Sequence, residues 1–292
     1  MSLVKLDQLR AILRGYESCL VAYSGGVDSV FLAQVAHDAL GDRALAVIAD
    51  SPSLPRAEFE EALALGEQFG FPVRVVKTKE FANADYLANP VNRCYFCKHE
   101  LFSELEPLAR AEGFAVIAYG ENASDVGDFR PGAQAAGEFK VRAPLKEAGL
   151  TKAEIRELSV QLGLPTADKP QMACLSSRIP YGESVSPAKL SMIERAEAVL
   201  RELGFHDVRV RHHELGHLPE TPPPTDRDRL RPRNHLARIE VGVTELPRLL
   251  GGELFQRIAA ELKQLGYAHV TLDLEGYRRG SLNARMPASL AT

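Results

Sequence analysis

The sequence predicts an α/β protein, in which a parallel sheet with helices on both faces is followed by a smaller C-terminal α+β domain. Over the first half of the chain, short apolar runs alternate with amphipathic helical segments. That alternation is the pattern of a parallel sheet. After residue 182 the order becomes helix, strand, strand, helix, strand, which is typical of an α+β domain. We therefore expect one domain over residues 1–180 and a second over residues 181–292.

Each element of the first domain follows from its periodicity. Strands are expected where apolar runs are short, and helices where apolar residues recur every three to four positions. One helix is expected to begin at Thr151, because Glu154 stands three residues on and completes the pattern of a capping box. The strands are expected at residues 20–23, 44–50, 73–77 and 115–119, and the helices at residues 30–40, 56–69, 98–112 and 151–163.

In the second domain, Ser186 is expected to cap a helix that begins at Pro187. Segment 216–234 interrupts the pattern, because it is rich in proline and arginine and lacks the apolar residues to form a core. We expect it to be a surface insertion. The helices are expected at residues 187–203 and 246–265, and the strands at residues 208–212, 237–243 and 269–274.

A glycine-rich loop, SGGVDS, joins the first strand to the first of these helices. Glycine lets the backbone approach a ligand closely, and the helix that follows offers unpaired N–H groups to an anion. The loop is not the Walker pattern, and it resembles the pyrophosphate loop of enzymes that split ATP into AMP and pyrophosphate. An ordinary strand-to-helix turn is the alternative. The expected phosphate-binding residues are Ser24, Gly25, Gly26, Asp28 and Ser29.

Three further predictions concern the nucleotide. Asp28 is a candidate for organising Mg²⁺ on the pyrophosphate, since that ion takes hard oxygen ligands; an aspartate that favours the helix dipole is the alternative. Asp50 and Ser51 end the second strand, and Asn122 and Asp125 follow the fourth. Because the carboxyl ends of parallel strands face one crevice, we expect these four residues to line the nucleotide site, although simple turns would also explain them.

The cysteines form the second constellation. Cys94 and Cys97 make a CxxC pair at the start of a helix, and Cys174 lies far downstream. Three thiolates could hold a [4Fe–4S] cluster with one iron left open, hold zinc with a further ligand, or act as thiols without metal. Cys19 lies on an apolar strand, where a free cysteine behaves as a hydrophobic residue, so we leave it out of the site.

Composition restricts the partners. The 292-residue chain has a net charge of −4, which gives no general basic field for nucleic acid. No apolar stretch approaches the ~20 residues that span a bilayer, and the N-terminus lacks a signal-peptide core. We therefore expect a cytoplasmic protein without a membrane or nucleic-acid partner, in which disulfides are not expected.

Several blocks of the sequence, in one order, resemble the ATP-dependent sacrificial sulfur transferases that mature the nickel-pincer nucleotide cofactor of lactate racemase (the LarE family). The resemblance covers nearly the whole chain, although segment 216–234 stands where a short turn is expected. The blocks are SGGVDS at residues 24–29, GENASD at 120–125, GDFRPG at 127–132, RAPL at 142–145, KP at 169–170, ACLSSRIPYG at 173–182, VRVRH at 208–212, ARIEV at 237–241 and LDLEGYR at 272–278.

The resemblance implies a reaction. With ATP and Mg²⁺, the enzyme would adenylylate the carboxylates of pyridinium-3,5-biscarboxylic acid mononucleotide, and a sulfur nucleophile would displace AMP to give thiocarboxylates. The three-cysteine type uses an extra sulfide on a [4Fe–4S] cluster, here held by Cys94, Cys97 and Cys174. Sacrifice of the Cys174 sulfur remains the alternative within the family.

The resemblance also implies a site for the substrate phosphate and a homo-oligomer. Other enzymes with this loop, which use ammonia or thiolate tRNA, are rival assignments, and so is a non-catalytic metal carrier. Glu197 and Glu240 match acidic positions near the phosphate site, where they would hold metal or orient arginines; isolated surface glutamates are their alternative. The residues that match the phosphate site itself are Lys98, Ser177, Arg178, Arg209 and Arg211.

Overall fold

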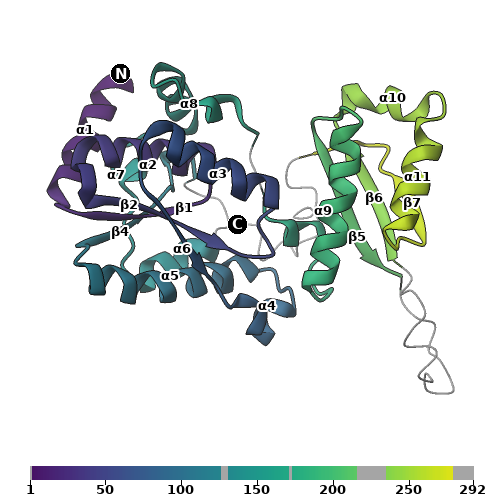
Figure 1. Ribbon diagram of the computed structural model, residues 1–292, viewed down its shortest axis with the longest axis horizontal. Coiled ribbons are helices and arrows are strands. Elements are labelled where there is room, and N and C mark those ends of the chain that lie inside the picture. Colours follow the sequence, from purple (N-terminus) through teal and green to yellow (C-terminus); the bar gives the residue numbers. More distant parts are fainter. Residues whose placement is uncertain (1, 126–130, 171–172, 216–234, 279–292) are drawn as a thin grey trace. The chain divides into compact units, whose positions relative to one another are not determined.

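The computed structural model describes residues 2–125, 131–170, 173–215 and 235–278, which form two compact units (Figure 1). The first unit takes the described residues up to Tyr86 and from Asn92 to Ala173, and the second takes Leu87–Val91 and the described residues from Cys174 onward. The chain therefore passes between the units three times. The expected insertion at 216–234 lies outside the described residues.

A parallel sheet forms the centre of the first unit. Its strands run in the order β3-β2-β1-β4, and every neighbouring pair is parallel. This arrangement confirms the predicted α/β class and places the carboxyl ends of β1, β2 and β4 at one edge of the sheet. The strands are β1 (Cys19–Tyr23), β2 (Ala44–Asp50), β3 (Val73–Lys77) and β4 (Val116–Tyr119).

Helices cover both faces of this sheet because each face is apolar (Figure 1). Side chains such as Val21 and Ile48 pack with one group of helices, and side chains such as Leu20 and Val47 pack with the other. On the first face lie α1 (Ser2–Gly15), α2 (Val27–Leu40), α3 (Arg56–Phe69), α7 (Pro144–Glu147) and α8 (Lys152–Gln161), and on the second α5 (Arg93–Glu112) and α6 (Pro131–Glu138).

The predicted capping box is present at α8. The Thr151 side chain accepts from the Glu154 backbone N–H, and the Glu154 carboxylate accepts from the Thr151 N–H. The remaining helical elements of this unit are short: η1 (Gly41–Arg43), η2 (Glu80–Ala82), α4 (Ala84–Leu87), whose last residue belongs to the second unit, η3 (Ala123–Asp125) and η4 (Pro165–Asp168).

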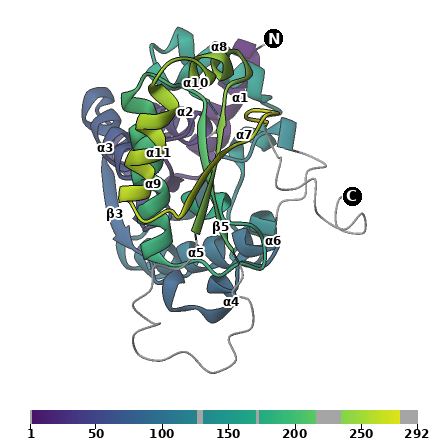
Figure 2. The same cartoon turned by 90° about the vertical axis from the view of Figure 1, so that its right-hand side faces the viewer.

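The second unit has a mixed sheet in the order β5-β6-β7, with β5 antiparallel and β7 parallel to β6. Helices α9 and α11 pack on its apolar face (Figure 2). Ser186 caps α9, as predicted. The elements are η5 (Leu175–Arg178), α9 (Pro187–Glu202), β5 (Val208–Glu214), β6 (His235–Val241), η7 (Val243–Glu245), α10 (Leu246–Leu250), α11 (Leu254–Gln264) and β7 (His269–Leu272).

One predicted element is wrong. The single helix expected over residues 246–265 is two helices, because Gly251 and Gly252 separate α10 from α11. Gly252 has φ +68°, a left-handed conformation that glycine adopts without a Cβ penalty. Across the described ranges, no helix is both long and apolar enough to cross a bilayer.

Candidate functional site

The SGGVDS loop connects β1 to α2 and is tied together by its own hydroxyl groups. The Ser29 hydroxyl donates to the Gly26 carbonyl (3.0 Å) and accepts from the Ser24 N–H (3.2 Å), and the two serine Oγ atoms lie 3.1 Å apart. α2 begins at Val27, so its first backbone N–H groups have no partner within the helix. The loop therefore has the form of an anion site at a helix N-terminus.

Two glycines let neighbouring parts of the chain pack closely against this loop. Gly25 has φ +71°, and a Cβ there would lie 2.7 Å from Ala62 Cβ on α3. Gly120, which follows β4, lies against the first turn of α2, since a Cβ there would be 3.1 Å from both Asp28 Cβ and Ser29 N. The loops that follow β1 and β4 are thus adjacent, which is the expected convergence at the carboxyl edge of the sheet.

Two lysines reach this loop that the sequence analysis did not identify. Lys152, the first residue of α8, pairs with Asp28 at 2.7 Å (Nζ to Oδ2). Lys169 pairs with Glu61 on α3 at 2.7 Å, and its Nζ lies 3.4 Å from the Gly25 carbonyl oxygen. Their distance along the chain from the loop hides them, because no spacing rule connects residue 28 to residue 152.

Asp50 and Ser51, predicted for the nucleotide, are engaged by protein groups. Asp50 pairs with Arg56 of α3 at 2.5 Å. The Ser51 hydroxyl donates to the carboxylate of Glu80, a buried residue. These contacts fix the segment after β2, and the turn alternative accounts for the geometry of both residues as well as nucleotide binding does.

Asn122 and Asp125 form a closed turn after β4. The Asp125 carboxylate accepts from the Asn122 N–H (3.1 Å), and the Asn122 side-chain oxygen accepts from the Ser124 N–H (2.9 Å). The Ser124 hydroxyl in turn accepts from the Lys152 N–H (3.0 Å). The turn therefore joins the start of α8 to the edge of the sheet, and a role for these residues toward nucleotide remains a prediction.

The CxxC pair lies in the first turns of α5, as predicted. Cys94 is exposed and Cys97 half-buried. Residues three apart share one face of a helix. Burial lowers the pKa of Lys98, whereas the two neighbouring thiols, Cys97 and Cys94, act in the opposite direction. Lys98 follows Cys97 directly in α5, and a cation near a thiol favours the thiolate form.

Cys174 belongs to the second unit, directly after one of the chain crossings. It precedes η5 and is half-buried. Among the described residues, no group of three His, Cys, Asp or Glu side chains is placed to hold a metal ion. Cys19 is buried, and burial raises the pKa of its thiol to about 12, which agrees with leaving it out.

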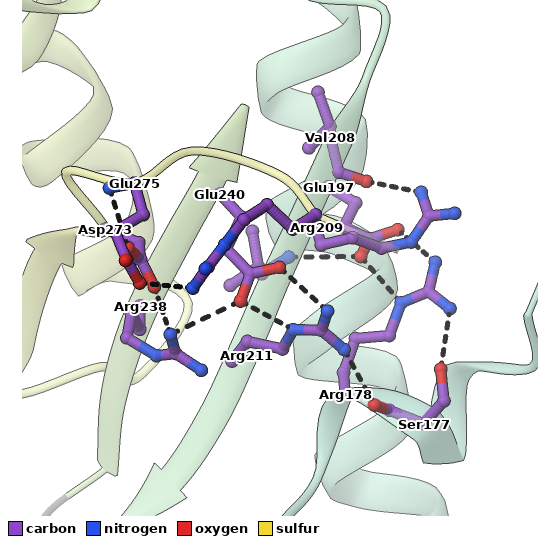
Figure 3. Close-up of polar contacts among 12 residues, drawn as sticks. Ser177, Arg178, Glu197, Val208, Arg209, Arg211, Arg238, Glu240, Asp273 and Glu275 are labelled. Carbon is purple, nitrogen blue, oxygen red and sulfur yellow. Dashed lines mark hydrogen bonds and ion pairs between the residues drawn. The ribbon is translucent and has the colours of Figure 1, made fainter. Parts of the chain in front are cut away.

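In the second unit, the structure brings together the predicted substrate-phosphate residues of that unit (Figure 3). Arg211 binds both carboxylate oxygens of Glu240 (3.0 and 2.7 Å) and donates to the Ser177 carbonyl (2.9 Å). Arg178 binds both oxygens of Glu197 (2.8 and 3.0 Å). Lys98, which was predicted for the same phosphate, belongs to the first unit.

Arg209, two residues before Arg211, makes contacts of another kind. It donates to the Val208 carbonyl (2.7 Å), and its guanidinium lies 4.9 Å from the centre of the Tyr277 ring. Burial and the nearby charge of Arg178 lower its pKa. The Glu197 charge acts in the opposite direction, and a role for Arg209 toward phosphate remains a prediction.

The sequence analysis missed the extension of this network across β6 and β7. Arg238 pairs with Asp273 and approaches Glu240 at 3.3 Å. Arg201 of α9 binds Glu197 at 2.9 Å. Arg238 stands in the ARIEV block of the family resemblance and, by strand alternation, shares a face with Glu240, but neither signal gave it a role. Five arginines thus stand against three carboxylates in the described part of this cluster: Arg178, Arg201, Arg209, Arg211 and Arg238 against Glu197, Glu240 and Asp273.

Comparisons with known proteins identify the sequences that this chain resembles. Residues 7–93 match the NAD synthase family model. The chain is 43% identical over 279 residues to an uncharacterised protein of Synechocystis sp., which covers 96% of this chain and 97% of that one. It is 28% identical over 214 residues to one component of the glutamine-hydrolysing GMP synthase of Pyrococcus furiosus, covering 68% and 67% of the two chains.

A further relative has a described activity. It is the pyridinium-3,5-bisthiocarboxylic acid mononucleotide synthase of Lactiplantibacillus plantarum, 34% identical over 294 residues, which cover 99% of this chain and 97% of that one. The aligned region includes both the phosphate loop and the arginine cluster, because it leaves almost no part of either chain out. This chain therefore belongs to the LarE family of pyridinium-3,5-bisthiocarboxylic acid mononucleotide synthases, within the ATP-using pyrophosphate-loop proteins.

Proposed function

We propose that this protein is an ATP-dependent sulfur transferase that converts the carboxylates of pyridinium-3,5-biscarboxylic acid mononucleotide into thiocarboxylates for nickel-pincer nucleotide biosynthesis. The observation that carries the proposal is the similarity to a named synthase over nearly the full length of both chains. The phosphate loop and the arginine cluster support it, since the reaction needs a site for ATP and a site for a phosphorylated substrate.

The first step activates the carboxylate. A carboxylate oxygen attacks the α-phosphorus of ATP, the bond to the β-phosphate bridging oxygen breaks, and pyrophosphate leaves with that electron pair. The loop N–H groups and the hydroxyls of Ser24 and Ser29 would hold the pyrophosphate. Asp28 would carry Mg²⁺ on its carboxylate. Positioning and charge neutralisation of this kind supply most of the catalysis in phosphoryl chemistry.

The second step transfers sulfur. A sulfur nucleophile attacks the acyl carbon, the bond between that carbon and the AMP oxygen breaks, and AMP leaves with the electron pair. The thiocarboxylate would then be freed by breaking the bond between its sulfur and the donor, either the bond to iron or, with loss of the Cα proton, the Cβ–S bond of Cys174. Thiolates are the usual ligands of iron–sulfur clusters, and the proposal assigns this role to Cys94 and Cys97, which stand three residues apart on α5, and to Cys174. A [4Fe–4S] cluster held by three thiolates supplies one open iron for an additional sulfide. Sacrifice of the Cys174 sulfur is the alternative donor.

The experiment is an anaerobic purification followed by a single incubation with ATP and the dicarboxylate mononucleotide. The expected results are about four irons and about four or five sulfides per chain, AMP and pyrophosphate, and a product in which sulfur has replaced oxygen. A colourless protein whose Cys174 loses about 34 Da during turnover, roughly one H2S, would instead show the sacrificial route. Absence of AMP and pyrophosphate would overturn the function.

A second candidate is an amide-forming ligase that uses ammonia, and the similarity to the GMP synthase component favours it. An ammonia user needs no cysteine trio. Combined Cys94→Ala and Cys174→Ala substitutions would leave its turnover intact, whereas the proposed transferase would continue to release pyrophosphate but form no thiocarboxylate. Cys19→Ala serves as the control, because that thiol is buried in the sheet core.

A further inference from the structure

Arg178 is fully buried, with 0% of its surface exposed, and it is the largest such side chain in the described part of the chain. Its Nε and one terminal nitrogen bind the two oxygens of Glu197, which is also fully buried. A bidentate arginine–carboxylate pair has a fixed geometry. Burial works to raise the pKa of Glu197, but the charge and hydrogen bonds of Arg178, together with the charges of Arg201 and Arg209, hold that pKa below its usual range.

Glu197 is itself held in place by two other elements. Its Oε1 accepts from the Val210 N–H of β5 (3.1 Å), and its Oε2 accepts from Arg201 of α9 (2.9 Å). In the described residues, β5 pairs with β6 alone, so this carboxylate caps the other edge of β5. The pair thus anchors Arg178 to both α9 and β5 (Figure 3).

The remaining nitrogen of Arg178 points back to the cysteine. It donates to the Cys174 carbonyl (3.1 Å) and to the Ser177 hydroxyl (3.2 Å). The Ser177 N–H also donates to the Cys174 carbonyl (2.9 Å). The backbone of Cys174 is therefore connected to the core of the unit by one side chain.

A second buried side chain fixes the segment that follows. The Asn89 side-chain amide donates to the carbonyls of Ile179 (3.3 Å), Pro180 (2.8 Å) and Glu183 (3.0 Å), and its backbone carbonyl accepts from the Gly182 N–H (2.9 Å). Asn89 is fully buried. The turn that begins at Cys174 is held from both ends, by Arg178 and by Asn89.

We infer that Arg178 and Glu197 are positioning residues that fix Cys174 for sulfur transfer, and that the substrate phosphate is bound by Arg209 without Arg178. To bind phosphate, Arg178 would have to give up its bidentate pair with Glu197, and separating a buried ion pair is unfavourable, or release the Cys174 carbonyl and the Ser177 hydroxyl. Arg209 instead contacts the Tyr277 ring face and the Val208 carbonyl, so an anion bound to it leaves the Arg178–Glu197 pair intact. The part of the inference that concerns sulfur transfer rests on the proposed function. The part that gives Arg178 and Arg209 different roles rests on the geometry alone.

Two variants separate the roles. Arg178→Lys keeps the positive charge but removes the planar guanidinium group that joins Glu197 to the Cys174 carbonyl. Arg209→Gln removes the positive charge near Tyr277. The binding probe is nicotinic acid mononucleotide, a pyridinium carboxylate with a single phosphate, titrated calorimetrically. We expect Arg178→Lys to bind it within about twofold of the parent protein and Arg209→Gln to bind it at least about tenfold more weakly. Equal weakening by both variants would overturn the inference.

Amide hydrogen exchange supplies a readout of the turn itself. In Arg178→Lys, exchange of the Ser177 amide should accelerate at least about tenfold, while the amides of β6 keep their protection; Arg209→Gln should leave Ser177 unchanged. Unchanged exchange at Ser177 in Arg178→Lys would overturn the positioning role. Glu197→Gln is the second variant if Arg178→Lys does not fold, and the same acceleration is expected from it.

Turnover then links the turn to the chemistry. In Arg178→Lys, AMP release should stay within about threefold of the parent while thiocarboxylate formed per AMP falls at least about tenfold, with KM for the mononucleotide unchanged. A raised KM with the product ratio unchanged would contradict the inference. If the parent protein forms no AMP, the proposed function fails, but the binding and exchange measurements still decide which arginine fixes Cys174.

Discussion

At the scale of single residues, the phosphate loop carries no cation of its own, and its positive charge comes from distant parts of the chain. Lys152 and Lys169 supply it, and each is now neutralised by a carboxylate, Asp28 or Glu61. A magnesium ion on Asp28 would compete with Lys152 for the same carboxylate. Lys152 would then be released to bind the phosphate oxygens. Binding of magnesium to Asp28 would thus make both Asp28 and Lys152 available to the pyrophosphate group.

Replacing Lys152 tests this exchange. Lys152→Met should lower kcat/KM for pyrophosphate release by about 10- to 100-fold, since a charge-assisted hydrogen bond to phosphate contributes about 1.5–3 kcal/mol. The measurement is pyrophosphate release with the dicarboxylate substrate. Lys79→Met is the matched control, because Lys79 pairs with Glu104 at 4.0 Å and contacts neither Asp28 nor the first turn of α8. A loss below about twofold in Lys152→Met would contradict the role.

Gly25 tests the loop conformation. Gly25→Ala places a side chain at φ +71° and 2.7 Å from Ala62 Cβ, so we expect a loss of about 1–3 kcal/mol in unfolding free energy and at least about tenfold weaker ATP binding. Denaturant unfolding and ATP titration measure the two effects. Gly26→Ala is the control for stability, since its nearest neighbour is Ser24 Oγ at 3.6 Å and it should change the free energy by less than about 0.5 kcal/mol. Similar losses in both variants would count against the strain argument.

Sequence reasoning found the groups of the site that a local pattern carries. The glycine loop, the CxxC pair and the alternation of Arg209 with Arg211 are visible as short motifs. Lys152, Lys169 and Arg238 were missed, because each meets its partner only through tertiary packing. Arg178 was found through a family motif, but the motif could not reveal that both Glu197 oxygens already occupy its guanidinium.

At the scale of elements, α8 has a second role besides packing on the sheet. Its N-terminus holds Lys152 next to Asp28, and the capping box of Thr151 and Glu154 fixes that first turn. The contact of the Lys152 N–H with the Ser124 hydroxyl joins the same turn to the segment after β4. The start of this helix thus sets where the lysine charge lies.

Thr151→Ala should therefore affect both stability and activation. Loss of the cap is expected to cost about 1 kcal/mol, and the frayed turn should lower pyrophosphate release by about two- to tenfold. Thermal unfolding and the pyrophosphate assay measure the two effects. Ser186→Ala removes the analogous cap of α9 and should cost a similar amount in stability while leaving pyrophosphate release unchanged. If Ser186→Ala slows release as much, general destabilisation would explain both.

Element boundaries followed from sequence where a strong local signal exists. The strands β1 to β4 lie within one residue of their predicted limits, and the caps of α8 and α9 were predicted residue by residue. The break between α10 and α11 was missed, because an apolar periodicity continues across Gly251 and Gly252. Helix α1 was not predicted either; its apolar face is completed by contact with α2, α7 and α8.

At the scale of the whole molecule, the two units have separate hydrophobic cores. The helices and strands of the first unit enclose two clusters of apolar side chains, one on each face of the sheet, and those of the second enclose another. Alternation of strands and helices predicted this division of fold types. The return of Leu87–Val91 to the second unit was not predictable, because it depends on the contacts of Asn89 with a segment about ninety residues away.

The buried histidine of the second unit gives the two cores different responses to acid. His212 is fully buried, its Nδ1 lies 3.2 Å from the Tyr267 hydroxyl, and its ring centre lies 4.5 Å from that of His235. Burial, with the charges of His235 and Lys189 adding to it, lowers its pKa from 6.5 to about 3. The folded state therefore keeps this ring neutral, whereas the unfolded chain takes up a proton below about pH 6.5. Stability from His212 is complete above about pH 6.5 and is lost progressively as the pH falls toward about 3.

In the first unit, a carboxyl group with a lowered pKa acts at lower pH. Hydrogen bonds from Lys5 and Thr151 lower the pKa of Glu154 from 4.5 to about 2, so the stability it contributes is retained down to about pH 4.5. Between about pH 6.5 and 5, the unfolding free energy of the second unit should fall by up to about 2 kcal/mol, while that of the first unit changes little.

Amide hydrogen exchange, corrected for intrinsic rates, measures this difference. Between about pH 7 and about pH 5, we expect exchange to accelerate in β5 and β6 but not in β1 and β2. His212→Phe, which keeps a ring beside His235 but takes up no proton, should abolish the difference. Equal acceleration in both sheets, or persistence of the effect in His212→Phe, would show that another group controls the acid response.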